Sequence, residues 1–255
     1  MDNSRLIGRN AAIASMFADE KQLKNYYRFT ALNPHLNLYD ACNILLQRPD
    51  ATVCFPYEEW NDLGRQVIRG KKSVTYYDYD GYKQYVFDVS DTRGENYQNS
   101  TIPIEKVIVG FEELNGTDIS EENDSDYVKI LKATKLYMHI QGIETHDNTR
   151  FDFLSEGIAY SLYVKTGLEQ NEAISIQCLP FDFKDNAELV KEVYIQAESL
   201  AQEIEDTYRN KEEEVAIIDD TEEETVSDEP IVSVEQVEQP KVAPYYSEIH
   251  RSAEA

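Results

Sequence analysis

Apolar side chains recur at helical spacing in the first part of the chain. Between residues 9 and 27 they stand three or four positions apart with charged residues between them, which predicts an amphipathic helix. Asn33-Pro34 interrupts this pattern, and a second helical stripe follows until Pro49, whose ring cannot continue a helix. The apolar positions of the second stripe are Tyr39, Cys42, Leu45 and Leu46.

The pattern then changes to the alternation that is typical of strands. Asp80-Gly81 separates two runs rich in β-branched and aromatic residues, and this arrangement predicts a β-hairpin. The first strand presents two faces, one with Val74 and Tyr76 and the other with Thr75, Tyr77 and Tyr79. The return strand presents one face shared by Lys83, Tyr85 and Phe87. One face of the hairpin has to pack on a core, and the alternation leaves open which one.

Helical periodicity returns after Pro103. Asn115-Gly116 marks the end of one helix, and apolar stripes predict two more, one around residues 127–138 and one over 151–165 that stops at Gly167. A capping-box pattern at Asp185 begins a long helix. Its apolar stripe consists of Leu189, Val193, Ala197, Leu200, Ile204 and Tyr208.

The chain therefore reads as α+β, with three parts. We expect a small N-terminal domain of helices and a β-hairpin over residues 1–100, and a mostly helical domain over residues 101–210. The stripes end near residue 210, and residues 212–255 hold 14 Asp and Glu against 2 Lys and Arg. This composition predicts that residues 211–255 are an acidic disordered tail or a linker.

The charge is distributed unevenly between these parts. The formal net charge is −25. Residues 1–100 are nearly neutral, with 12 Lys and Arg against 13 Asp and Glu, whereas residues 101–255 have 12 against 36, a net charge of −24. The first part can meet a polyanion, and the rest would repel one.

Cysteine usage and hydropathy indicate the compartment. The three cysteines have no CxxC spacing, and no apolar run approaches the length of a membrane span. We expect a reduced, cytoplasmic protein without a membrane partner. Its oligomeric state is not indicated by the sequence.

A basic turn precedes the hairpin. Four cations gather around Gly64 and Gly70, and they are Arg65, Arg69, Lys71 and Lys72. Cations that hold phosphates beside rings that stack on bases are typical of a single-stranded nucleic-acid surface. The competing interpretation is an ordinary hairpin with solvated lysines. Trp60, the only tryptophan, is expected to anchor the core with its indole N–H hydrogen-bonded.

The stretch around this turn has a recognisable order, in which a tryptophan is followed by a Gly-Arg-x-Val-x-x-Gly-x-Lys segment and then by Val-Phe-Asp-x-x-x-Thr. Its positions are Trp60, Gly64, Arg65, Val67, Gly70, Lys72, Val86, Phe87, Asp88 and Thr92. It resembles the N-terminal domain of ArdC-type antirestriction proteins, in which a tryptophan helix leads to the same segment and then to a strand with the same ending. The resemblance covers roughly residues 20–97 and implies single-stranded DNA as the partner. The contacts expected here are Arg65, Arg69, Lys71, Lys72, Tyr77, Tyr79, Lys83 and Arg93.

The second part resembles the zincin-like metallopeptidase domain of the same family, in a degenerate form. The resemblance places Glu156 at the position of the third zinc ligand. A zincin also needs His-Glu-x-x-His, because two imidazoles hold the metal and the glutamate acts as general base. The nearest register here begins with Lys135-Leu136 and ends at His139, so the first imidazole and the base are missing. We expect no catalytic residue, no bound metal and no cofactor.

Three functions agree with these observations. The first is a non-enzymatic accessory protein of a phage or conjugative element, with a DNA-binding module and an antirestriction role implied by the resemblance. The second is an acidic protein inhibitor of a host restriction or CRISPR-type nuclease, which acts by protein–protein contact or DNA mimicry. The third is the N-terminal module of a larger DNA-processing protein.

Overall fold

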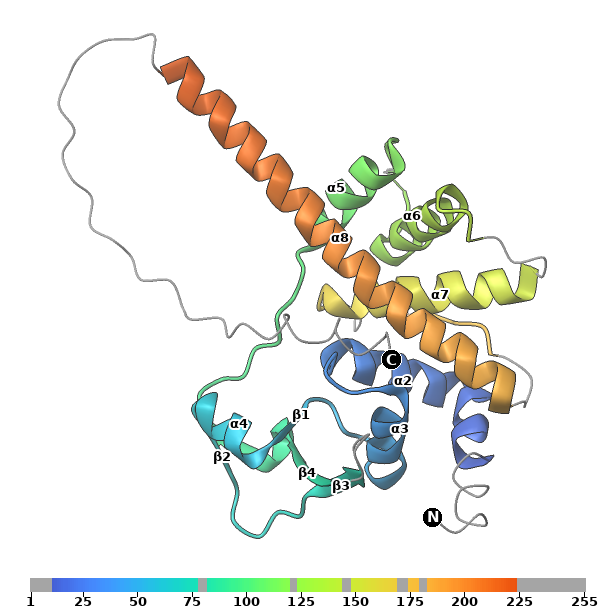
Figure 1. Cartoon of the computed structure of the whole chain (residues 1–255), viewed down its shortest axis with the longest axis vertical. Coiled ribbons are helices and arrows are strands. Elements are labelled where there is room, and N and C mark those ends of the chain that lie inside the picture. The colour runs from blue at the N-terminus through green and yellow to red at the C-terminus, as the bar shows by residue number, and fades with distance from the viewer. Residues whose placement is uncertain are drawn as a thin grey trace, which may run out of the picture. The chain divides into compact units, whose positions relative to one another are not determined.

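The computed structural model describes residues 11–77, 82–119, 123–143, 148–168, 174–178 and 183–223, with the backbone alone for 183–186 and 212–223. Among these residues the architecture is α+β, with helices at the start, small antiparallel sheets in the middle and a helical second half (Figure 1). This confirms the predicted fold class. No helix within the described ranges combines the length and the apolarity needed to cross a membrane.

The helical start contains a break that the sequence pattern did not predict. Residues 11–17 are helical, and α2 (Glu20–Leu32) begins only after a turn at Ala18 and Asp19. The Asp19 side chain accepts a hydrogen bond of 2.9 Å from the backbone N–H of Gln22, which caps a new helix. The single helix predicted over residues 9–27 is therefore wrong at this point.

Helix α3 (Leu38–Gln47) follows and ends before Pro49, as predicted. Its apolar stripe is narrower than the sequence suggested. Cys42 and Leu45 are buried, whereas Tyr39 and Leu46 are 44% and 42% exposed. The buried face of the helix also includes Leu38, Ala41 and Ile44, so Tyr39 and Leu46 lie at its edge.

Two small antiparallel sheets carry the middle of the chain. The first has the strand order β1-β4-β3, with β1 at Cys54–Pro56, β3 at Val74–Tyr77 and β4 at Lys83–Asp88. The second pairs β2 (Arg65–Val67) with β5 (Thr92–Gly94). Helix α4 (Tyr57–Asp62) connects β1 to β2, and a short 3-10 helix, η1 (Val89–Asp91), connects β4 to β5. The predicted hairpin is confirmed as the β3–β4 pair, and its Asp80-Gly81 turn lies outside the described residues.

The second half consists of four helices in the described ranges, α5 (Ile104–Asn115), α6 (Asp126–Ile140), α7 (Asn148–Lys165) and α8 (Phe183–Glu223). Helix α5 ends where predicted, because Gly116 takes the left-handed backbone conformation of a helix cap (φ 64°). Helix α8 extends beyond the end predicted near residue 210, and the predicted tail from residue 224 onward lies outside the described residues. The last turns of the helix are rich in Glu, which sustains a helix without an apolar stripe.

Helix α8 crosses the other helices of this half and closes their core (Figure 1). Its predicted stripe is buried from Leu189 to Ile204. Two glycines permit its close approach, because a Cβ on Gly110 of α5 would lie 2.8 Å from Ile204, and one on Gly157 of α7 would lie 2.8 Å from Val193. The Tyr194 hydroxyl also donates to the carbonyl of Pro34, which joins α8 to the start of the chain.

One hydrophobic core includes residues from both sides of position 100. Helix α2 packs on α7, and the side chain of Tyr27 lies against Gly157. Residues up to Glu214 form one compact unit, and residues 215–255 form another. The predicted boundary at residue 100 falls inside the first unit, and a separate domain there stays a prediction.

Candidate nucleic-acid interface

The β3–β4 hairpin turns one face toward the core and one face outward. Val74 and its cross-strand partner Val86 are buried, so the face they share packs inward. Alternation places Tyr77 and Tyr85 on the opposite face, where they are 57% and 51% exposed. The structure thus settles which face of the predicted hairpin is accessible, and it is the face of Tyr77.

A lysine accompanies the two exposed rings. Lys83 is the cross-strand partner of Tyr77, and its Nζ lies 5.1 Å from the centre of the Tyr85 ring. An ammonium group at this distance from a phenol ring makes a favourable cation–π contact. Two rings and one cation therefore share the outward face of the hairpin.

At the other end of the sheet, aromatic side chains pack together around a buried tryptophan. Trp60 of α4 is fully buried, and its indole N–H donates a 2.8 Å hydrogen bond to the carbonyl of Phe87. Phe55 and Tyr97 pack edge-on against the indole, with ring centroids 5.2 and 5.4 Å away. The expectation that Trp60 anchors the core is confirmed, because its ring is fully buried and packs against both of these rings.

The basic turn joins β2 to β3, and a backbone hydrogen bond holds it against η1. The N–H of Ile68 donates to the carbonyl of Asp91 at 2.8 Å, and the N–H of Lys71 donates to the carbonyl of Ile68 at 3.1 Å. Gly70 between them has φ 91°, a conformation that other residues adopt only with strain. Arg69 and Lys72 are exposed on either side of this turn.

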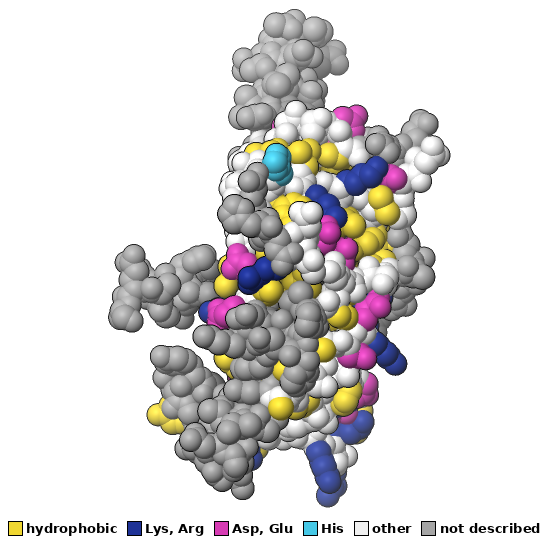
Figure 2. Space-filling view, turned by 90° about the vertical axis from the view of Figure 1, so that its right-hand side faces the viewer, with side chains coloured by type: hydrophobic (Ala, Val, Ile, Leu, Met, Phe, Trp, Pro, Cys, Tyr) yellow, Lys and Arg dark blue, Asp and Glu magenta, His cyan; other side chains and the backbone are white. Residues whose placement is uncertain are grey.

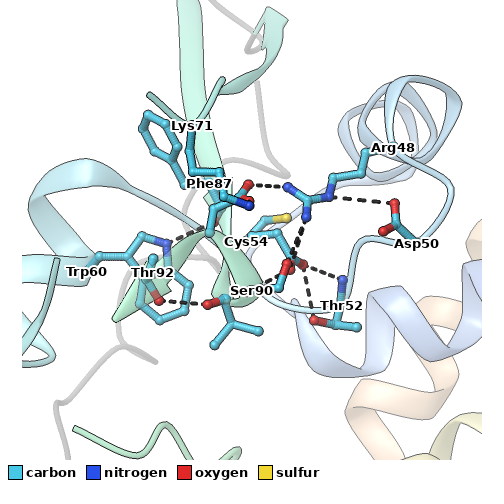
Figure 3. A network of polar contacts seen from close by, with 12 residues as sticks. Arg48, Asp50, Thr52, Cys54, Trp60, Lys71, Phe87, Ser90 and Thr92 are labelled. Atoms are coloured by element: carbon cyan, nitrogen blue, oxygen red, sulfur yellow. Dashed lines mark hydrogen bonds and ion pairs between the residues drawn. The ribbon is translucent and has the colours of Figure 1, made fainter. Parts of the chain in front are cut away.

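A polar network connects the turn to the end of α3 (Figure 3). Arg48 forms an ion pair with Asp91, and one of its nitrogens lies 2.8 Å from the Ser90 hydroxyl and 3.7 Å from the Asp88 carboxylate. Lys71 pairs with the other oxygen of Asp91 at 2.8 Å. Asp88 in turn accepts hydrogen bonds from the N–H groups of Thr52 and Ser90. Both carboxylates are buried and both are paired, as buried charges have to be.

The network controls the ionisation of Asp91. Burial by itself raises the pKa of this carboxyl, because water stabilises the charged form. Hydrogen bonds and positive charge from Arg48 and Lys71 outweigh burial, so the pKa lies below its ordinary value. Asp91 is therefore ionised at neutral pH and holds two cations at once.

The side chain of Arg65 also forms contacts within the protein. Its Nε donates to the Thr92 hydroxyl at 2.7 Å, another nitrogen donates to the carbonyl of Glu95, and the guanidinium lies 5.9 Å from the centre of the Trp60 ring. These contacts hold β2 to β5.

The expected contact residues therefore fall into three groups. The first group is exposed and consists of Arg69, Lys72, Tyr77, Lys83 and Arg93. Engaged in contacts within the protein are Arg65 and Lys71. Tyr79 lies outside the described residues. Tyr85 was absent from the expected set, although alternation placed it beside Lys83, because the sequence did not say which face is outward.

The residues around Glu156 do not fit a zinc ion. Lys135, which the sequence resemblance aligns with the first histidine of a zincin, pairs with Asp152 at 2.7 Å. Glu156 accepts a 2.6 Å hydrogen bond from the N–H of Gln177, and burial raises the pKa of its carboxyl. An ammonium group thus stands where a metal-binding imidazole is required. Within the described ranges, no group of three or more His, Cys, Asp or Glu side chains is arranged to hold a metal ion.

The surface carries both signs of charge. On the face drawn in Figure 2, basic and acidic side chains of the described residues are interspersed. On this face, an attractive site for a polyanion would therefore be local, built from a few neighbouring cations.

Comparison with known proteins gives a limited result. No protein-family model matches the chain, and no curated protein matches it. Among solved structures, it is similar to the metal-free crystal structure of the antirestriction ArdC protein from the R388 plasmid. That similarity covers 69% of this chain and 86% of the other, at 14% sequence identity and a TM-score of 0.38. A similarity of this extent leaves the assignment of function to the residues of this chain.

Proposed function

We propose that this chain is a non-enzymatic antirestriction protein of a mobile genetic element that binds single-stranded DNA through the outward face of its β3–β4 hairpin. The observation that carries the proposal is the pair of exposed rings, Tyr77 and Tyr85, with Lys83 beside both. Bases stack on aromatic rings with little regard to sequence, and nearby cations bind the phosphates that link them.

The basic turn supplies the phosphate contacts next to the hairpin. Arg69 and Lys72 are exposed directly before β3, the strand that carries Tyr77. Stacking requires unpaired bases, so this arrangement favours single strands over duplex. The sequence resemblance to the N-terminal domain of ArdC-type proteins supports the same ligand and suggests the antirestriction role.

The absence of enzymatic activity is part of the proposal. It is supported by Lys135 and Leu136, which replace a metal-binding histidine and the general base in the register closest to a zincin motif. The Lys135–Asp152 ion pair adds to this, because it neutralises a carboxylate one helical turn from Glu156.

Fluorescence anisotropy with a short labelled oligonucleotide tests the DNA-binding step. We expect the full chain to bind a single strand more tightly than a duplex of the same sequence. Tyr77→Ala and Tyr85→Ala should each weaken binding at every salt concentration, by about 1–3 kcal/mol per stacked base, which is about fivefold to 150-fold. Tyr57→Ala is the matched control, because Tyr57 is 49% exposed but lies on α4.

The biological role needs its own measurement. An unmodified plasmid introduced into a restricting host should survive more often when the wild-type chain is present, and the Tyr77→Ala/Tyr85→Ala variant should give less protection. Protection that is undiminished in this variant would separate antirestriction from DNA binding.

One outcome favours the nuclease-inhibitor function instead. The net charge of −24 over residues 101–255 suits a partner with a basic nucleic-acid groove. A chain that fails to bind single strands at low salt, yet inhibits a purified restriction nuclease in stoichiometric amounts, would support that function.

A further inference from the structure

Asp91 connects the end of α3 to the basic turn through ion pairs. It is only 3% exposed, and its two carboxylate oxygens have different partners, Arg48 on one side and Lys71 on the other. Its backbone carbonyl accepts a hydrogen bond from the N–H of Ile68, the first residue of the turn. One residue thus holds the turn by both its side chain and its backbone.

Arg48 makes this connection from the side of α3. It is the C-terminal cap residue of the helix, and its side chain is 19% exposed. It lies within ion-pair distance of both buried carboxylates, Asp88 and Asp91. Two buried acids and two cations balance in charge, so the network stabilises a single position of the turn.

Lys71 consequently differs from its neighbours in the turn. Its side chain is 44% exposed, but its ammonium is already paired with Asp91. Arg69 and Lys72 are exposed, and neither forms an ion pair with another residue that the structure describes. The positive charge available to a ligand at this turn belongs to these two side chains.

We propose that Arg48, Asp91 and Lys71 are positioning residues of the nucleic-acid site, and that they hold the basic turn so that Arg69 and Lys72 meet the phosphates. This inference rests on the proposed DNA binding. A turn that is already ordered loses little conformational entropy on binding, and this preorganisation increases affinity. Lys71 contributes through Asp91 and not through a phosphate.

Asp91→Asn tests the inference by the sign of its effect. The substitution keeps the shape of the side chain and removes a negative charge next to a phosphate site. Charge alone predicts tighter DNA binding. A positioning role predicts weaker binding, by about threefold or more, because the turn loses both ion pairs. Anisotropy titrations of the full chain at low salt, with circular dichroism to confirm folding, measure this.

Salt dependence separates contact from positioning in a second way that does not require Asp91 to be changed. Each phosphate contact contributes about 0.7 to the slope of log affinity against log salt for single strands. Lys72→Gln should therefore reduce the steepness of this negative slope by about 0.7. If Lys71 were an independent contact, Lys71→Gln/Lys72→Gln would reduce the steepness by about 1.4. A positioning role predicts that the double variant has about the same slope as Lys71→Gln alone.

Arg48 provides the conservative control. Arg48→Lys keeps one positive charge near Asp91 and should recover part of the affinity that Arg48→Met loses. Additive slopes for Lys71 and Lys72, or tighter binding by folded Asp91→Asn, would overturn the positioning role while DNA binding stands. A wild-type chain that binds no single strand at low salt would instead remove the proposed function itself.

Discussion

Trp60 and Arg65 illustrate how contacts within the protein decide what a residue can offer to a ligand. Both belong to the stretch that resembles a DNA-binding domain, and both have the chemistry to stack on or pair with a nucleotide. The indole is covered by Phe55 and Tyr97, and the guanidinium binds Thr92 and the carbonyl of Glu95. Trp60 is buried and Arg65 has partners within the protein, whereas Tyr77 and Lys72 are exposed.

Trp60→Phe separates a structural tryptophan from a stacking one. The change removes the donor to the Phe87 carbonyl and leaves a small void, so we expect unfolding to become easier by about 2–3 kcal/mol. Urea denaturation followed by circular dichroism measures this. DNA affinity at a temperature where the variant is folded should change less than in Tyr77→Ala. A stable variant with lost affinity would contradict the assignment.

Glu156 should make stability depend on pH in a defined direction. Its pKa is raised in the folded chain, so the folded state holds the proton more strongly than the unfolded state, whose pKa is about 4.3. Stability therefore falls as pH rises from about 4.3 through the folded pKa. Glu156→Gln keeps an oxygen for the N–H of Gln177 and has no charge to desolvate.

We expect this variant to melt at or slightly above the wild-type temperature at pH 7, and the difference should shrink as the pH approaches 4. Thermal melts across this range, with Glu58→Gln on the exposed side of α4 as the control, check the effect. A large loss of stability at pH 7 would mean that the carboxylate has a cationic partner.

What could be predicted at this scale depended on the distance between partners along the chain. The burial of Trp60 and Cys42 followed from residue type and local pattern. The pairing of Lys71 with Asp91, and of Arg65 with Thr92, could not be predicted, because these partners meet only after β4 has returned beside β3. For this reason the sequence did not reveal that two of the expected DNA contacts, Lys71 and Arg65, have partners within the protein.

At the scale of elements, periodicity predicted most of the helices and the hairpin. The stripe of α8 and the glycine end of α5 are where the sequence placed them. The break at Asp19 was missed because apolar spacing continues across it, while a capping side chain restarts the helix. The contribution of Gly157 was also missed, since a glycine inside a helix indicates a close neighbour without saying which one.

Gly157→Ala tests the close crossing of α7 with α2 and α8. The new Cβ would lie 2.8 Å from Cγ1 of Val193 and 3.0 Å from the Tyr27 ring, which should cost about 1–3 kcal/mol. Alanine favours a helix over glycine by about 1 kcal/mol, which offsets part of that cost. We expect a net loss of stability in chemical denaturation.

The double variant Gly157→Ala/Val193→Ala distinguishes the clash from other effects. Because the substitution removes Cγ1, the added methyl should cost less stability than it does in the wild-type background. The double variant should therefore lose less stability than the sum of the two single variants. A Gly157→Ala chain that is more stable than the wild type would contradict the crossing.

At the scale of the whole molecule, the order of helical and alternating patterns along the chain predicted the α+β class. It did not predict that α2 and α7 share a core, because contacts between segments so far apart leave no local pattern. A fragment of residues 1–100 would expose the face of α2 that contains Leu23 and Tyr27. Binding measurements on the candidate interface therefore require the full chain or a truncation that preserves this core.

Truncation after Glu214, the end of the first compact unit, tests the influence of the acidic end on DNA binding. Residues 215–255 contain 11 Asp and Glu and 2 Lys and Arg, so removing their net charge of −9 leaves −16 from −25. We expect the melting temperature to stay nearly unchanged, because the core and the Lys211–Glu113 ion pair are kept.

Affinity for a single strand should rise on this truncation at about 0.01 M salt, where charges act over roughly 30 Å, and the gain should vanish near 1 M, where they act over about 3 Å. A chain in which a neutral Gly/Ser sequence of equal length replaces residues 215–255 is the control. It should bind as tightly as the truncated chain, since the expected effect comes from charge and not from bulk. Weaker binding by both variants would mean that residues beyond Glu214 contribute to the DNA site, and a lower melting temperature would mean that they stabilise the core.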